Sequence, residues 1–179
     1  LARLLEWFWN GAWRSGIQNG KMFFNDVPEA KGTLDFVGLN YYTHVLVGPA
    51  SVSLLKMKFP KRRQEVATEF GYPMYAEGLR RAVEFLAPLG VPIEITENGV
   101  ADANDSLRTE HLKRHLWVLS QAIQDGHDVR SYHHWSLMDN FEWAEGYSMR
   151  FGLHHVDFET QERTLRPSGA VYKSIVEQH

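Results

Sequence analysis

The sequence predicts an α/β fold with a parallel sheet whose two faces are covered by helices. Three short apolar segments are typical of buried strands, and they span residues 34–42, 91–96 and 129–137. Apolar residues at helical spacing fill the segments before, between and after these strands, at residues 4–16, 75–87, 107–125 and 167–176. Three strands alone would leave both edges of such a sheet exposed.

Glycine and proline residues predict where the helices end and begin. Gly16 is expected to end the first helix, and Pro88 and Gly90 to stop the second. Gly126 follows the third helix at the position of a left-handed C-terminal cap. Pro167 suits the first position of the last helix, because the N–H that proline lacks has no partner there.

The composition indicates a folded protein and excludes several functional classes. The chain has 179 residues, a formal net charge of −3 and 44% hydrophobic residues, which is typical of a globular domain. Because it has no cysteine, it has neither disulfides nor thiolate metal sites. No apolar run approaches the roughly 20 residues that cross a bilayer, so we expect no membrane partner. The basic segment 56–63 is expected to be a solvated surface loop, and no nucleic-acid partner is expected.

The chain begins at Leu1, inside the first expected helix and without an initiator methionine. We therefore expect that a preceding part is cut off or missing, and that any targeting signal lies outside the sequence. The expected location is the cytoplasm.

The third helix combines an apolar face with two histidines. Its buried face is predicted from the apolar residues at helical spacing, Leu112, Leu116, Leu119 and Ile123. His111 and His115 have the spacing of a helical zinc pair, but the glutamate that follows the first histidine in such motifs is absent. They are interpreted as solvated helix residues. His133 and His134 are neighbours on a strand and point to opposite faces, so we expect no metal ion and no other cofactor.

Polar and aromatic residues follow each expected strand, at the edge of a parallel sheet where ligand chemistry gathers. They are Asn40 and Tyr42 after the first strand, Glu97 after the second, and Trp135, Asp139, Asn140, Glu142 and Trp143 after the third. Strand alternation places Glu97 on the same face as Ile93 and Ile95, and turns Glu94 toward the helices. We expect one pocket to collect a carboxylate, an amide, a phenol and two indoles.

Each of these residues also has a simpler interpretation. Glu97 alone would be a loop carboxylate before an Asn-Gly turn. Asp139 and Asn140 are equally suited to cap a helix, and Trp135 and Trp143 to anchor a core. The coincidence at three successive strand ends favours a binding site, because core packing gives no reason to place polar residues there.

Three motifs resemble the family 1 glycoside hydrolases, the β-glucosidase and β-galactosidase group. The segment 95–99, Ile-Thr-Glu-Asn-Gly, is similar to the nucleophile motif of that family. The segment 135–147 resembles the signature after its last barrel strand, and the segment 35–42 resembles its sixth strand. The resemblance implies an enzyme with a (β/α)₈ TIM-barrel fold. Residues 1–179 would form one partial TIM-barrel domain, the carboxyl-terminal portion with strands six to eight and their helices.

The resemblance also implies roles for individual residues. Glu97 would be the nucleophile that attacks the anomeric carbon, and Tyr42 would donate a hydrogen bond to it. The sugar would be bound by Asn40, Trp135, Glu142, Trp143 and Phe151. These residue types suit the chemistry, because an anion stabilises an oxocarbenium-like transition state and an indole face packs on the C–H groups of a sugar.

The general acid/base of the family lies in an Asn-Glu-Pro motif after the fourth strand, and no Asn-Glu pair occurs in this chain. The implied function is a retaining β-glycosidase that hydrolyses terminal β-D-glycosides through a glycosyl-enzyme on Glu97, with the isolated chain inactive. Expected partners are a β-glycoside or oligosaccharide and a complementary amino-terminal barrel part. The alternative is a non-catalytic half-barrel that associates with itself or binds sugar weakly.

Overall fold

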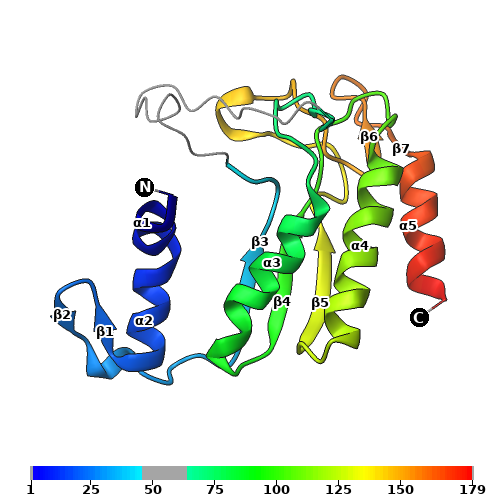
Figure 1. Ribbon diagram of the computed structural model, residues 1–179. Coiled ribbons are helices and arrows are strands. Elements are labelled where there is room, and N and C mark those ends of the chain that lie inside the picture. Colours follow the sequence, from blue (N-terminus) through cyan, green and yellow to red (C-terminus); the bar gives the residue numbers. More distant parts are fainter. Residues whose placement is uncertain (1, 46–63, 179) are drawn as a thin grey trace.

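The computed structural model describes residues 2–45 and 64–178, and it contains a three-stranded parallel sheet (Figure 1). The strands, in spatial order, are β3 (Val37–Asn40), β4 (Ile93–Asn98) and β5 (Val129–His134). The helices after each strand are α3 (Ala76–Leu86), α4 (Arg108–Gln124) and α5 (Pro167–Glu177). The prediction of parallel strands joined by helices is therefore confirmed. The basic segment 56–63 lies outside the described residues.

The core lies between the sheet and a single layer of helices. Leu79 of α3 and Leu119 of α4 pack with Ile93 and Ile95 of the central strand. Figure 1 shows α3 and α4 side by side on this face. The opposite face carries exposed polar residues such as Asn40. The prediction that helices cover both faces is wrong for the part of the chain that the structure describes, because the second face is polar.

The amino-terminal helix runs further than predicted. It comprises α1 (Ala2–Glu6), the π-helical turn η1 (Trp7–Gly11) and α2 (Ala12–Asn19). The predicted end at Gly16 is wrong, because Gly20 ends the helix in the left-handed conformation with a φ of 68°. Gly16 is instead buried against the hairpin that follows, where an added Cβ would lie 3.5 Å from Met22.

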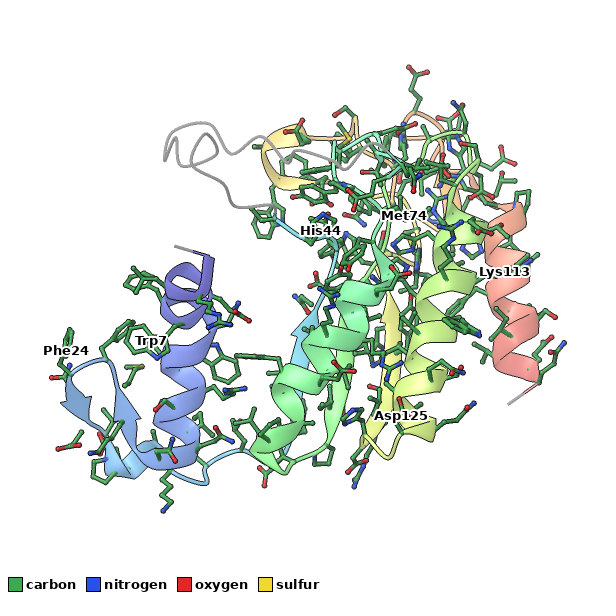
Figure 2. The ribbon with its side chains drawn as sticks, viewed as in Figure 1. Trp7, Phe24, His44, Met74, Lys113 and Asp125 are labelled. Atoms are coloured by element: carbon green, nitrogen blue, oxygen red, sulfur yellow. The ribbon has the colours of Figure 1, made fainter. Side chains whose placement is uncertain are left out.

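The remaining elements are short. They are the hairpin β1 (Lys21–Met22) and β2 (Asn25–Asp26), the hairpin β6 (His154–Val156) and β7 (Arg163–Leu165), and the 3₁₀ turns η2 (Pro28–Ala30), η3 (Ala87–Leu89) and η4 (Trp143–Glu145). The first hairpin projects away from the sheet, and Phe24 at its tip is 99% exposed (Figure 2). The second lies at the carboxyl end of the strands (Figure 1). Across residues 2–45 and 64–178, no helix has the length and apolar character needed to cross a membrane.

Candidate active site

The central strand carries one residue more than either neighbour near its carboxyl end. Leu39 and Asn40 are adjacent on β3, yet their partners Ile95 and Glu97 lie two positions apart on β4. The pairing with β5 shifts over the same stretch, between Ile95 and Asn98. A β-bulge of this kind bends the strand and re-aims a side chain.

The bulge determines the direction of Glu97. Ile93 and Ile95 belong to the core under the helices, so strict alternation would also turn Glu97 toward the helices. The predicted arrangement is therefore wrong on both counts: Glu97 leaves the face of the isoleucines, and Glu94 lies on the open face. Because of the extra residue, Glu97 instead reaches the hydroxyl of Tyr42.

Tyr42 holds one oxygen of Glu97. Its hydroxyl donates a hydrogen bond to Oε2 of Glu97 over 2.7 Å. Burial, together with this hydrogen bond, raises the pKa of Tyr42 well above its ordinary value of 10. The phenol therefore stays protonated through the neutral range and remains a donor. Among the described residues no hydrogen bond reaches Oε1 of Glu97.

Two amides order the strand ends around this carboxylate. The Thr96 hydroxyl donates to Oδ1 of Asn40 over 2.6 Å, which leaves the amide nitrogen of Asn40 as a donor on the exposed side. Asn98 is fully buried: its Nδ2 donates to the Tyr41 carbonyl over 2.7 Å, and its Oδ1 accepts from the Tyr132 hydroxyl over 2.8 Å. The sequence indicates Asn98 only as part of a turn, whereas its side chain joins all three strands.

The loop after β5 brings an indole and a second carboxylate. Trp135 Nε1 donates to Oε2 of Glu142 over 3.3 Å, and the Trp135 amide donates to the Asn98 carbonyl over 2.9 Å. The charge of Glu142 also contributes to the raised pKa of Tyr42, after burial and Glu97. The negative charges of Glu97 and Glu142 thus both favour the protonated phenol of Tyr42.

Gly99 allows this loop to approach β4, because a Cβ at Gly99 would collide with the Trp135 carbonyl oxygen. We expect Gly99→Ala to lower the free energy of unfolding by about 1–3 kcal/mol, the cost of overpacking, as measured by urea denaturation. Gly16→Ala is the matched control, because its Cβ would make an ordinary 3.5 Å contact inside a helix. An equal loss in the two variants would contradict this role of Gly99.

Of the remaining predicted sugar-binding residues, one is buried and one is exposed. Phe151 is buried, and its ring lies edge-on to Tyr42 with centroids 6.2 Å apart. Trp143, which follows Glu142 directly, is 80% exposed. Phe70, which the sequence does not predict as a site residue, has its ring centroid 6.1 Å from that of Phe151. The ring centroid of Tyr72 lies 4.6 Å from that of Phe70. No motif marks these two aromatic residues, because they come from the irregular segment before α3.

Asp139 caps no helix and lies in a buried ion pair. Its buried carboxylate accepts hydrogen bonds from the Arg166 guanidinium over 2.9 Å and from the Gly152 amide over 2.9 Å. Burial alone would raise the pKa of Asp139, but these hydrogen bonds outweigh it and hold the pKa below its ordinary value. Asn140 likewise caps no helix, and its Nδ2 donates to Ser136 Oγ over 3.0 Å. Both residues fix the shape of the loop that carries Trp135.

The interpretation of His111 and His115 as solvated residues is wrong. They are 1% and 0% exposed, because α4 turns them toward the sheet. The described residues contain no group of three or more side chains placed to bind a metal ion.

The described site thus holds Glu97 in contact with Tyr42, and Trp135 in contact with Glu142. The chain belongs to glycosyl hydrolase family 1, whose model matches residues 15–179. This match confirms the predicted family and enzyme class. The three-stranded parallel sheet with its helices is a part of the TIM barrel that the family shares.

Individual relatives agree with this assignment. The chain is 38% identical to a β-galactosidase of Saccharolobus solfataricus, over 94% of this chain and 36% of the relative. It is 39% identical to β-glucosidase A of Thermotoga maritima, over 85% of this chain and 36% of the relative. The structure of a Thermotoga maritima β-glucosidase in complex with noeuromycin matches 98% of this chain and 46% of its own, with a TM-score of 0.85 and 32% identity. The chain thus spans about a third of the length of these curated relatives.

Proposed function

We propose that the chain carries the nucleophile and part of the sugar subsite of a retaining β-glycosidase that hydrolyses terminal β-D-glycosides. The observation that carries the proposal is Glu97, with Oε2 held by Tyr42 and Oε1 unbound within the described residues. The matched relatives are β-glucosidases and β-galactosidases.

The proposed reaction has two displacements. Oε1 of Glu97 attacks the anomeric carbon, the glycosidic C–O bond breaks, and the leaving oxygen takes a proton from a general acid. Water then attacks the same carbon, gives up a proton to the conjugate base, and releases Glu97. Tyr42 donates a hydrogen bond to Oε2 in both steps, which fixes the orientation of the Glu97 carboxylate.

Trp135 and Glu142 would bind the sugar. The indole face packs on the C–H groups of the ring, while the carboxylate of Glu142 accepts hydrogen bonds from hydroxyls. The donor on Asn40 would face the same ring, and Phe151 would support Tyr42 from behind. Trp143, which is exposed, would join the subsite only after it moves or is covered.

The general acid is proposed to come from a complementary amino-terminal barrel part. That part would also pair with the edges of β3 and β5, which carry no further strand in the described residues. General acid–base catalysis contributes about 10² to 10⁴ in rate, so the chain alone should hydrolyse ordinary glycosides very slowly.

A 2-deoxy-2-fluoroglucoside with a dinitrophenolate leaving group tests the nucleophile, because this leaving group needs little protonation. We expect the chain to gain one fluoroglycosyl unit, as measured by intact mass, and peptide mapping to place it on Glu97. Glu97→Gln should remain unlabelled, and Glu145→Gln, which changes an exposed carboxylate of the neighbouring loop, should label normally. A chain that acquires no adduct would support the alternative, a non-catalytic half-barrel.

A further inference from the structure

Three histidines form a buried cluster between α4 and the carboxyl end of β5. His111 and His115, one turn apart on α4, stack with ring centroids 3.9 Å apart and planes 26° apart. His134 is the last residue of β5 and interacts electrostatically with both. Both ring nitrogens of His111 and Nε2 of His115 have no hydrogen-bond partner among the described residues, and His115 Nδ1 lies 2.8 Å from the His111 carbonyl.

The cluster has aromatic walls and charges of both signs around it. The rings in contact are Tyr41, 6.0 Å from His115, and Tyr172 of α5, 6.1 Å from His134. The charged groups are Arg108 and Arg114 of α4, Glu77 of α3, and Asp105 before α4. Arg108 is fully buried and acts on both His111 and His134, and therefore opposes a positive charge on either ring.

These surroundings keep the imidazoles neutral. Burial lowers the pKa of His115 to about 4, although the His111 carbonyl and Glu77 favour the charged ring. Burial and Arg108 lower the pKa of His134 to about 3, although Asp105 and the Phe151 carbonyl oppose them. Burial and His115 hold the pKa of His111 well below 6.5. Protonating any one ring would bury a charge next to Arg108 or another histidine, which the fold can avoid only by opening.

The cluster lies directly behind the proposed sugar subsite. His134 precedes Trp135 in the chain and pairs with Asn98 across the sheet. The Trp135 amide donates to the carbonyl of that same Asn98. A movement of β5 away from α4 would therefore displace Trp135 from Glu142.

We propose that His111, His115 and His134 are positioning residues for Trp135, which they hold in place only while their rings are neutral. Proton uptake separates α4 from the end of β5 and releases the indole. The importance of Trp135 for sugar binding rests on the proposed function, whereas the positioning itself is a property of the fold.

The sign of the pH dependence follows from the buried neutral state. Below pH 6.5 the unfolded chain binds protons that the folded chain refuses, so stability falls as the pH drops toward the lower folded values. Urea denaturation at several pH values between 7 and 5 gives the free energy of unfolding as a function of pH. We expect its slope to show that the unfolded chain binds more protons than the folded chain. His134→Phe and His111→Phe should each reduce that number by about one at the acid end of this range.

His133→Phe is the matched control, because His133 is the exposed neighbour on the same strand. The number of extra protons should be lower in His134→Phe than in His133→Phe. If the number of extra protons on the unfolded chain is the same in His134→Phe, His111→Phe and the parent chain, the proposal is overturned.

The indole N–H resonance of Trp135, assigned from Trp135→Phe, reports the position of the side chain. On acidification it should leave its neutral-pH position at a higher pH in the parent chain than in His134→Phe, by about one pH unit. If the substituted chains do not fold, ring titration of the parent chain decides. A cluster histidine that titrates near pH 6.5 while the Trp135 resonance stays in place contradicts the proposal.

These measurements need no catalysis. Loss of the fluoroglycosyl adduct with an intact pH response would reject the proposed function alone. A normal adduct with no role of the histidines in the pH response would reject only the positioning.

Discussion

Glu97→Gly should abolish glycosidase activity when the chain is co-expressed with the part of a family 1 relative that precedes the matched region. Without the carboxylate, no glycosyl-enzyme forms and no anion faces the developing positive charge. Removing a catalytic nucleophile costs on the order of 10⁴ to 10⁶ in kcat. The measurement is the rate of dinitrophenolate release from a β-glucoside.

Azide should restore activity to this variant. The glycine leaves space at the position of Oε1, so azide attacks the anomeric carbon there, forms a C–N bond and expels dinitrophenolate. A single displacement inverts the configuration, and NMR should identify the product as the α-glycosyl azide. Glu110→Gln, which removes an exposed carboxylate of α4, should retain full activity. Hydrolysis by Glu97→Gly at the parent rate, or a β-azide product, would assign the nucleophile elsewhere.

Arg166→Met should cause the largest loss of stability of any single substitution discussed. Arg166 donates to both oxygens of Asp139, over 2.9 and 3.1 Å, and its removal leaves the buried carboxylate with only the longer contact to Arg150, at 3.4 Å, as an arginine partner. Breaking a buried pair from one side costs about 3–5 kcal/mol. Urea denaturation at pH 7 measures this loss, and Lys173→Met, which removes an exposed pair with Glu177, should change the free energy of unfolding little.

The pH dependence of this loss identifies Asp139 as its source. The folded-state pKa of Asp139 is lowered, so its contribution is complete above its ordinary pKa near 4 and disappears as the pH falls through the lower folded value. The difference between the parent chain and Arg166→Met should therefore be full at pH 7 and shrink below about pH 4. A difference that does not depend on pH would mean that lost packing of the arginine side chain causes the effect.

Much of the fold follows from local patterns in the sequence. The strands and helices were predicted because apolar spacing and terminal glycine or proline residues are local signals. The helix predicted at residues 107–125 is observed as Arg108–Gln124, and that predicted at 75–87 as Ala76–Leu86. Local patterns do not predict that helices cover only one face of the sheet. The sequence pattern of a short apolar strand is the same whether helices cover one of its faces or both.

The buried face of α4 shows how a pattern can point to the wrong stripe. Leu112 and Leu119 are buried as predicted, whereas Ile123 is 51% exposed. The observed stripe contains His111 and His115, at the same three- and four-residue spacing as the leucines. The helical spacing of His111 and His115 thus places them on the buried face, although their polarity predicts solvated residues.

The direction of Glu97 depends on pairing between strands. Ile95 and Asn98 pair with neighbouring strand residues through a bulge, and no local pattern in residues 93–98 reveals the extra residue. The hydrogen bond between Tyr42 and Glu97 follows from that bulge. Motif resemblance predicts the contact between Tyr42 and Glu97 that the structure contains, whereas strict strand alternation would turn Glu97 to the opposite face.

The bulge on β4 also divides the strand into two segments that can change independently. Ile93 and Ile95 pack against the helices, whereas Glu97 contacts Tyr42 on the opposite side of the sheet. Isoleucine-to-valine exchanges before the bulge would therefore alter the fit of α3 and α4 while the carboxylate keeps its direction. One extra residue thus allows the core and the site to be altered separately, within a strand of six residues.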